Sequence, residues 1–358
     1  MRSTADTPSR GATPGRAAIE SDASFPLARR FPALRSLPRA RLGAFPSPVV
    51  RIAGVGARGG LWVKRDDLNA PSLGGNKVRA LELLLGEVQP GDEVLTIGGE
   101  GSTHVLATAV FGRALGARVT AIRWRHEMNP AAHAVAARAA AVCDRVYTTA
   151  SAPAALALAL LTRVRHAPRW VPAGGSSALG VLGHANAALE LADQIARGEL
   201  PQPSRVVVPL GSGGTAAGLA LGFAIAGLDI VVVGARVAPR LVANRGHVLA
   251  LARAGRRLIA ALERAAHGTR ARPVIPRVDP RRVQVAHDAY GGAYGRPAPA
   301  AREAAARIER AAGLRLDDTY SAKALAVALA LDLAGEGDTL FWLTFDPRTL
   351  DGTGLSYG

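Results

Sequence analysis

Apolar residues in this chain fall into short continuous runs that alternate with longer segments of helical periodicity. The runs that predict strands cover residues 61–64, 93–97, 118–123, 145–148, 170–172, 205–210, 229–234 and 339–344. Between them, the pattern predicts helices over 78–85, 131–141, 152–165, 216–226, 244–266 and 300–312, and two more that end at 115 and 195. Strands that alternate with helices in this way form parallel sheets with helices on both faces. The predicted fold class is therefore α/β, with binding sites at the carboxyl ends of the strands.

Length and composition agree with this prediction. The 358 residues, 49% hydrophobic and only 4% aromatic, can bury a large core in one large or two medium domains. No apolar run approaches the length of a membrane span, so we expect no membrane partner. Residues 1–25 mix Ser, Thr, Pro, Gly and Arg without the apolar region of a secretory signal. We predict a disordered tail there and a cytoplasmic protein.

The formal net charge of +16 raises the question of a nucleic-acid partner. The basic residues are scattered, however, with local densities only at 29–41 and 253–282. No aromatic residues are interleaved to stack on bases, and no zinc-finger spacing occurs. We therefore expect no nucleic-acid partner, and interpret the charge as an arginine-rich surface that attracts small anions.

The cysteine and histidine positions argue against redox and metal chemistry. Cys143 is the only cysteine, so an intramolecular disulfide is excluded, and a small buried side chain is favoured over a nucleophile. His126 and His133 are seven residues apart with Pro130 between them, and no carboxylate stands in position to complete a site. We predict no metal.

Lysine is scarce in this chain, with three lysines against forty-one arginines. One of them, Lys77, lies in the glycine-bracketed turn Leu73-Gly-Gly-Asn-Lys-Val-Arg79. A guanidinium stays protonated, whereas an amine can lose its proton and attack a carbonyl. A lysine retained in so arginine-rich a sequence is therefore a candidate for Schiff-base chemistry, and Lys77 is the first candidate.

A second glycine-rich turn, Gly211-Ser-Gly-Gly-Thr215, directly follows an apolar strand and opens a helix. Free N–H groups at a helix N-terminus, with the hydroxyls of Ser212 and Thr215, favour a bound phosphate. The alternatives are a tight turn that holds no ligand and a loose dinucleotide fingerprint. The dinucleotide fingerprint requires an acidic residue at the end of the next strand, and Arg236 stands there instead.

A phosphate cradle and a lysine in a glycine turn together suit one cofactor. Pyridoxal 5'-phosphate needs an anion clamp at one end and an amine for its aldehyde at the other. The alanine-rich sheet would supply the apolar slot between the two. We therefore predict pyridoxal 5'-phosphate as the cofactor.

The segments around these turns resemble the tryptophan-synthase-β-like (fold type II) pyridoxal-phosphate enzymes. Within that group they are most similar to the 1-aminocyclopropane-1-carboxylate deaminase / D-cysteine desulfhydrase family. The resemblance runs from about residue 42 to 344, and it is carried by the segments 63–68, 74–79, 172–180, 211–215, 294–297 and 319–324. It implies two three-layer α/β/α domains with mostly parallel sheets: a large domain of residues 26–87 and 175–358, and a small one of 88–174. It also implies a homodimer and a small amino-acid substrate.

The resemblance further implies roles for individual residues. Lys77 matches the lysine that bonds the cofactor aldehyde, Asn76 the asparagine at the ring hydroxyl, and Thr344 the residue near the pyridine nitrogen. The predicted catalytic residues are Lys77, Ser102, Tyr294 and Tyr320. The predicted cofactor-binding residues are Asn76, Lys77, Gly211, Ser212, Gly213, Gly214, Thr215 and Thr344. The predicted substrate-binding residues are Ser102, Thr103, His104 and Ser321.

Two positions separate the activities of this family. The deaminases look like Tyr-Glu-Gly-Lys and His-Leu-Gly-Gly, and the desulfhydrases like Tyr-Thr-Gly-Lys and His-Thr-Gly-Gly. Here Ser321 and Thr344 carry hydroxyls at both positions, which suits the milder electron demand of β-elimination. We therefore predict a D-cysteine desulfhydrase-like α,β-elimination that gives a 2-oxo acid, ammonia and sulfide, with Lys77 removing the α-proton. Ring-opening deamination is the alternative.

Three departures from the family pattern bear on the substrate. Gly101-Ser-Thr103-His stands where the family has Gln-Ser-Asn-His, Leu106 replaces an arginine, and Phe345-Asp346 replace two glycines. These changes remove amide donors from the substrate loop and place a ring and a charge beside the pocket. A second alternative is therefore a non-catalytic relative that only binds the cofactor.

Overall fold

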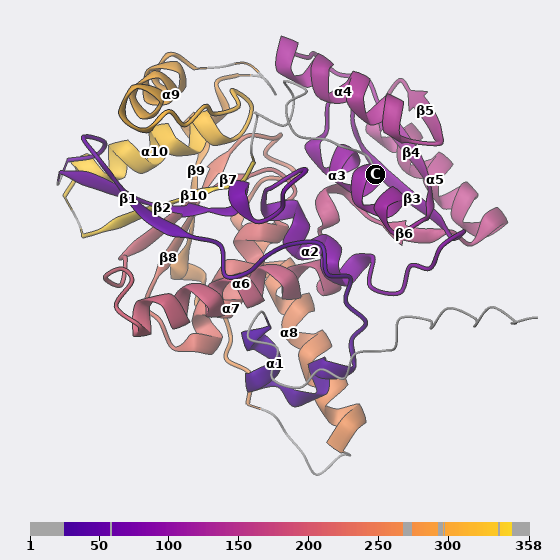
Figure 1. Ribbon diagram of the computed structural model, residues 1–358, viewed down its shortest axis with the longest axis horizontal. Coiled ribbons are helices and arrows are strands. Elements are labelled where there is room, and N and C mark those ends of the chain that lie inside the picture. Colours follow the sequence, from indigo (N-terminus) through magenta and orange to yellow (C-terminus); the bar gives the residue numbers. More distant parts are fainter. Residues whose placement is uncertain are drawn as a thin grey trace, which may run out of the picture.

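The computed structural model describes residues 25–57, 59–267, 274–292, 296, 298–335 and 337–345. Their strands form two separate sheets (Figure 1). The larger has the order β1-β2-β10-β7-β8-β9, with bounds Val49–Ala53, Gly60–Arg65, Thr339–Leu343, Arg205–Leu210, Val231–Arg236 and Val283–Ala286. The smaller has the order β5-β4-β3-β6, with bounds Arg145–Thr149, Arg118–Trp124, Glu93–Gly99 and Arg169–Val171. Neighbouring strands pair in parallel except β1, which is antiparallel to β2.

Helices pack on both faces of each sheet. One face of the larger sheet carries α6 (Ala178–Ala196), α7 (Gly214–Ala226) and α8 (Arg245–His267), and the other carries α9 (Pro299–Ala312) and α10 (Ser321–Leu333). The smaller sheet lies between α5 (Ala152–His166) on one side and α3 (Thr103–Ala114) with α4 (Pro130–Val142) on the other. The short α1 (Pro26–Arg30) and α2 (Asn76–Leu84) complete the α-helices of the described residues. The 3₁₀ turns are Pro32–Ser36, Asp66–Leu68, Ala173–Gly175, Pro280–Arg282 and His287–Tyr290.

The predicted alternation of strands and helices is confirmed, and with it the α/β class. The bounds shift by a few residues: the strand predicted at 229–234 occupies Val231–Arg236, and the helix predicted from 216 begins at Gly214. Among the α-helices and strands above, four were not predicted: α1, β1, β9 and α10. The predicted tail lies outside the described residues apart from Phe25, which is buried. The predicted domain boundaries stay predictions.

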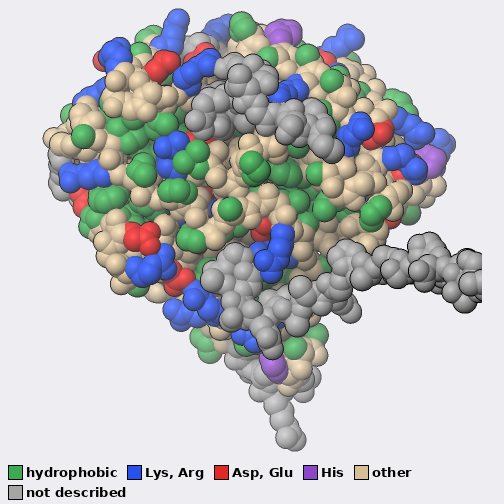
Figure 2. Space-filling model, in the orientation of Figure 1, with side chains coloured by type: hydrophobic (Ala, Val, Ile, Leu, Met, Phe, Trp, Pro, Cys, Tyr) green, Lys and Arg blue, Asp and Glu red, His purple; other side chains and the backbone are tan. Residues whose placement is uncertain are grey.

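Basic side chains are spread over the surface. On the face that Figure 2 shows, Lys and Arg side chains lie scattered among hydrophobic and uncharged ones, with acidic side chains beside several of them. Exposed ion pairs such as Arg169 with Glu87 and Arg197 with Glu199 place carboxylates next to guanidinium groups. This face therefore has the scattered arrangement of arginines expected from the sequence.

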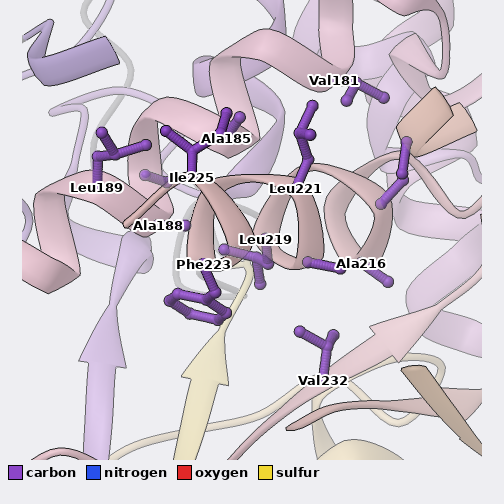
Figure 3. Close-up of a cluster of buried hydrophobic side chains, with 14 of the residues drawn as sticks. Val181, Ala185, Ala188, Leu189, Ala216, Leu219, Leu221, Phe223, Ile225 and Val232 are labelled. Carbon is purple, nitrogen blue, oxygen red and sulfur yellow. The ribbon is translucent and has the colours of Figure 1, made fainter. Parts of the chain in front are cut away.

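Small residues let α6 approach both α7 and α2 closely. In Figure 3, Ala185 and Ala188 of α6 meet the apolar side chains of α7, which also pack toward Val232 of β8. A side chain at Gly218 of α7 would come within 2.3 Å of His184 Cβ, and one at Gly183 of α6 within 2.0 Å of the Arg79 carbonyl oxygen. The contact of α6 with α2 therefore depends on a glycine, because interiors are packed too densely to yield such space.

A buried ion cluster joins β2, α2 and α6 where this packing is closest. Arg79 of α2 binds both oxygens of Asp66 (Nε to Oδ2, 2.8 Å; NH2 to Oδ1, 2.6 Å) and also Glu190 Oε2 of α6 (NH1, 2.9 Å). Lys64 of β2 is fully buried, and its Nζ donates to Glu190 Oε1 at 2.5 Å and to the Ser47 carbonyl oxygen at 2.7 Å. The cluster is electrically balanced, with two cations and two carboxylates.

The electrostatics of the cluster keep both carboxylates ionised. Burial raises the pKa of Asp66 and of Glu190, but the charges of Arg79 and Lys64 outweigh burial and hold both pKa values below their ordinary range. Burial lowers the pKa of Lys64, yet its Nζ faces a third acceptor, Gln194 Oε1, at 2.5 Å. Three acceptors match the three N–H groups of an ammonium ion.

We expect Lys64→Met to lower the free energy of unfolding by about 3–5 kcal/mol, because it leaves a buried carboxylate uncompensated. The double variant Lys64→Met/Glu190→Gln restores neutrality and should regain part of the loss. Arg118→Met, which breaks an exposed pair with Glu93, is the control and should cost about 1 kcal/mol or less. Urea unfolding followed by circular dichroism measures all three. Equal losses for Lys64→Met and Arg118→Met would contradict the assigned role.

Candidate active site

Lys77 stands in the first turn of α2, and backbone contacts with β10 fix the start of that helix. The Asn76 amide N–H donates to the Thr344 carbonyl oxygen at 2.9 Å. Gly75 precedes the helix at φ 138°, and a side chain there would come within 2.4 Å of the same carbonyl oxygen. Glycine is therefore required at 75 by both conformation and space. This contact places the start of α2, with Lys77, beside the carboxyl end of the central strand β10. The carboxyl ends of the strands are where α/β sheets bind their ligands.

The surroundings of Lys77 favour its neutral amine. The side chain is partly buried, and burial lowers its pKa from 10.5 to about 8. Among the residues that the structure describes, no carboxylate pairs with it. His104 and His184 are both buried nearby, and burial followed by the charge of Lys77 lowers the pKa of each, that of His104 to about 3. Lys77 thus shares its surroundings with two neutral imidazoles.

The predicted phosphate loop follows β7 and opens α7. Gly213 adopts φ 87°, and α7 begins at Gly214, so the first backbone N–H groups of the helix stand at the loop. Ser176, from the turn before α6, donates to Ser212 Oγ at 2.8 Å, and its Oγ accepts from the Gly214 N–H at 3.1 Å. A side chain at Gly214 would meet Ser176 Oγ at 2.7 Å. The loop therefore gathers hydroxyl and N–H donors around one point.

One hydrogen bond connects this loop to the lysine turn. Asn76 Nδ2 donates to Thr215 Oγ1 at 2.7 Å, and His184 Nε2 lies 3.4 Å from the same hydroxyl. The structure thus brings together two motifs that lie far apart in the sequence. These groups fit pyridoxal phosphate: a desolvated amine for the aldehyde, and hydroxyl and N–H donors without a carboxylate for the phosphate.

The predicted substrate loop opens α3. Ser102 caps this helix, and its Oγ accepts from the Val105 N–H at 3.5 Å. Ser102 and Thr103 are partly buried, whereas His104 is 2% exposed and directs Nε2 toward Thr96 Oγ1 at 3.4 Å. Ser102 and Thr103 therefore stand at the helix N-terminus, where a carboxylate binds favourably, and His104 lies in the interior. Their roles in binding stay predictions.

The N-terminus of α10 supplies the other predicted side of the site. The carboxylate of Asp317 accepts from the Tyr320 N–H at 2.6 Å and from the Ser321 N–H at 3.1 Å, and burial raises its pKa. Ser321 is fully buried and Thr344 is 6% exposed. Helix α10 packs against β7 and β10, the strands that lead to the phosphate loop and to Thr344. Predicted residues Tyr294 and Asp346 lie outside the described residues.

The structure also accounts for residues whose roles the sequence left open. Lys64 belongs to the buried ion cluster, and Lys323 donates to the Tyr290 carbonyl oxygen at 2.8 Å. Phe345 is 7% exposed and joins an apolar cluster with Val78 and Leu81, so its ring takes part in a core behind α2. Cys143 is buried as expected, and burial raises its pKa to about 11.

Three residues near the site were missed: Ser176, His184 and His247, whose Nε2 lies 3.2 Å from the Ser212 carbonyl oxygen. Only Ser176 had a signal, because it falls in a segment that carried the resemblance. No cluster of three or more His, Cys, Asp or Glu residues that could hold a metal ion occurs within the described ranges. None of the described helices combines the length and apolar character needed to cross a membrane.

Comparisons with known proteins agree with this geometry. A family model for pyridoxal-phosphate dependent enzymes matches residues 40–344. The nocardicin C-9' epimerase of Nocardia uniformis subsp. tsuyamanensis is 36% identical, over 87% of this chain and 94% of its own. A D-cysteine desulfhydrase of Salmonella choleraesuis (strain SC-B67) is 30% identical, over 74% of this chain and 79% of its own.

Solved structures show the same fold. The crystal structure of an ACC deaminase homologue matches with a TM-score of 0.72 and 25% identity, over 90% of this chain and 95% of that chain. The crystal structure of a T.th. threonine deaminase matches with a TM-score of 0.57 at 17% identity, over 91% of this chain and 98% of that chain, and supports the fold alone. The chain therefore belongs to the pyridoxal-phosphate-dependent enzymes, and it is of the ACC deaminase / D-cysteine desulfhydrase type.

Proposed function

We propose that this enzyme catalyses α,β-elimination of a small amino acid, in the manner of a D-cysteine desulfhydrase, and releases a 2-oxo acid, ammonia and sulfide. The observation that carries the proposal is the environment of Lys77. It is a desolvated amine with no acidic partner among the described residues, one residue from the asparagine that contacts the phosphate loop. The pair of hydroxyl side chains at Ser321 and Thr344 supports elimination over ring opening.

The proposed roles come from the family resemblance, and the positions of the residues support them. With the cofactor bound, Lys77 would remove the α-proton of the substrate, and general-base catalysis of this kind raises a rate roughly 10²–10⁴-fold. Ser102 and the N-terminal N–H groups of α3 hold the substrate carboxylate. The bound cofactor supplies the conjugated ring that takes up the electrons released with the α-proton. Tyr320 stands at the start of α10 to exchange protons, a role that it shares with Tyr294 in this proposal.

Residues of the loop and the lysine turn position the cofactor. Ser212, Thr215 and the loop N–H groups would hold the phosphate, and Asn76, whose amide donates to Thr215, would stand beside the ring hydroxyl. Asp317 accepts from the Ser321 N–H and so fixes the backbone of Ser321 at the start of α10. In this proposal the hydroxyls of Thr344 and Ser321 would stand where the pyridine nitrogen of the cofactor binds. A hydroxyl at this position leaves that nitrogen less protonated than a carboxylate would. In β-elimination the electrons released with the α-proton expel the β-substituent, so the reaction needs a weaker electron sink in the cofactor ring.

Epimerisation is a second candidate, because the nocardicin C-9' epimerase is 36% identical along most of both chains. Epimerisation and elimination begin with the same step, removal of the α-proton by Lys77. They diverge afterwards: in elimination the β-substituent leaves, and in epimerisation a proton returns to the opposite face of the α-carbon. The two reactions therefore need the same cofactor-binding residues and differ in the groups around the side chain.

A substrate panel distinguishes the candidates. With D-cysteine we expect sulfide and a 2-oxo acid in equal amounts, measured colorimetrically, and a much lower rate with L-cysteine. An epimerase would instead return inverted amino acid that carries deuterium at the α-carbon after reaction in D₂O, without sulfide. Ring opening of 1-aminocyclopropane-1-carboxylate to a 2-oxo acid would identify the deaminase alternative. Absence of all these products from cofactor-loaded protein would favour the non-catalytic relative.

The lowered pKa of Lys77 predicts how apoenzyme takes up cofactor. Only the neutral amine attacks an aldehyde, so the rate of recombination with pyridoxal phosphate should rise about tenfold per pH unit and level off above about pH 8. A rate that still climbs steeply at pH 9.5 would show an unperturbed lysine. Stopped-flow absorbance measures this rate.

Removal of the amine tests the assignment of Lys77 directly. Lys77→Ala should lose the absorbance of the covalently bound cofactor, and borohydride should fix no cofactor to the protein. Lys323→Arg is the matched control, because it removes a different buried lysine, that of α10, and should keep the absorbance. Cofactor fixed by borohydride to Lys77→Ala would assign the bond to a different lysine.

We also infer a homodimer, a cytoplasmic location and the division into large and small domains, all from the family resemblance. Light scattering on the purified enzyme measures the mass, and a monomeric mass at micromolar concentration would contradict the dimer.

A further inference from the structure

Ser176 stands outside the predicted phosphate loop and reaches it from the turn between β6 and α6. Gly174 and Gly175 give this turn its shape, with φ 65° and 71°, and the Ser176 N–H donates to the Ala173 carbonyl oxygen at 3.2 Å. The turn packs directly on the loop, because a side chain at Gly174 would come within 2.0 Å of Ser212 Oγ. The backbone of the turn therefore fixes the position of Ser176 beside the start of α7.

The hydrogen bonds of the Ser176 hydroxyl have a direction. A backbone N–H only donates, so the Gly214 N–H, at 3.1 Å, uses a lone pair of Ser176 Oγ. Ser176 donates its own proton to Ser212 Oγ at 2.8 Å. Because a hydroxyl carries a single proton, this arrangement leaves the proton of Ser212 for another acceptor.

This chain of hydrogen bonds begins at the N-terminus of a helix, and that origin strengthens it. Gly214 is the first residue of α7, where the aligned peptide dipoles place a partial positive charge. Consecutive hydrogen bonds polarise one another, so the hydroxyl at the end of the chain becomes a better donor. Ser212 therefore donates to an anion more strongly than a serine without such a partner would.

Thr215, the other hydroxyl residue of the loop, is held by the lysine turn. Asn76 donates to Thr215 Oγ1 at 2.7 Å. Both hydroxyls of the loop thus accept from a residue outside it, Ser212 from Ser176 and Thr215 from Asn76. Of these two partners, Asn76 belongs to a motif that was expected to bind the cofactor, whereas Ser176 had no assigned role.

We propose that Ser176 is a positioning residue for the cofactor phosphate, which orients the Ser212 hydroxyl so that its proton is donated to the phosphate. The inference rests on the phosphate site of the proposed function, and it does not depend on which reaction follows. Ser176 acts through Ser212 in this proposal, and it takes no part in proton transfer at the substrate.

The test compares pyridoxal phosphate with pyridoxal, which has the same ring and aldehyde but no phosphate. Dissociation constants of both are measured by absorbance on the full-length protein after removal of its cofactor. We expect Ser176→Ala to raise the constant for pyridoxal phosphate about tenfold relative to the native protein, because Ser212 loses the partner that orients it. The constant for pyridoxal should stay unchanged. An unchanged constant for pyridoxal phosphate, or an equal rise for both ligands, would overturn the proposal.

A double-mutant cycle shows whether Ser176 acts through Ser212. Ser212→Ala should also weaken pyridoxal phosphate and spare pyridoxal, since it removes the hydroxyl that meets the phosphate. Adding Ser176→Ala to that variant should then change the affinity less than about twofold, because no hydroxyl is left to orient. A further tenfold loss in the double variant would show that the two serines act independently, which contradicts the positioning role.

Ser177→Ala is the matched control, because it makes the same change at the next residue of the turn. Ser177 caps α6 by accepting from the Gly180 N–H at 3.1 Å, so its loss should lower the melting temperature and leave both dissociation constants unchanged. A selective loss of pyridoxal phosphate in this control as well would assign the effect to the stability of the turn and overturn the proposal.

The outcomes separate this inference from the proposed reaction. The expected affinities in a protein that releases no sulfide from D-cysteine would count against elimination and leave the role of Ser176 standing. Sulfide release from a Ser176→Ala protein with native affinity for pyridoxal phosphate would remove that role and leave elimination standing.

Discussion

The buried cluster of Arg79, Asp66, Glu190 and Lys64 is the constraint on which the site depends, because it sets the rotation of α2 about its axis. Arg79 is two residues beyond Lys77, which on an α-helix is a rotation of roughly 200°. When Arg79 is held in the interior by two carboxylates, Lys77 must project from the opposite side of the helix. Apolar packing alone permits small rotations of a helix, whereas hydrogen-bonded ion pairs satisfy only one arrangement. We interpret the cluster as a device for orientation more than for stability, since buried ion pairs gain little net free energy.

Lys64 and Lys77 show two opposite solutions for a lysine in a protein interior. Lys64 is surrounded by three acceptors, and loss of its proton would leave one of them without a donor. Burial lowers the pKa of Lys77 to about 8, and no carboxylate among the described residues opposes this effect. The difference lies in the neighbours supplied by α6 and α3: Glu190 for one lysine, and the neutral His104 for the other. This contrast separates Lys64, which belongs to the buried scaffold, from Lys77, which is proposed as the reactive group.

The sequence predicts those features that local patterns encode. Apolar strands, alanine-rich helices and the two glycine turns all depend on neighbours within a few residues, and the structure confirms their order. The unpredicted strands β1 and β9 are short edge strands in which only Ile52 and Val283, respectively, are buried, so their pairing depends on the sheet beside them. The ion cluster could not be predicted because Lys64 and Glu190 are 126 residues apart. Ser176 and Ser212 meet for the same kind of reason, through the packing of α6 against α7, which no local pattern specifies.

The two sheets carry different parts of the proposed site, and this bears on how substrate specificity can change in such an enzyme. The residues proposed to bind the cofactor, Asn76, Thr215 and Thr344, lie at the larger sheet and are hydrogen-bonded to one another through Asn76. The predicted substrate loop at Ser102 opens a helix of the smaller sheet, and it reaches the larger one through side-chain contacts such as Asn129 with Thr319. Substitutions in that loop can therefore alter the substrate without disturbing cofactor chemistry. This separation is consistent with the similarity of the chain both to a D-cysteine desulfhydrase and to a nocardicin C-9' epimerase.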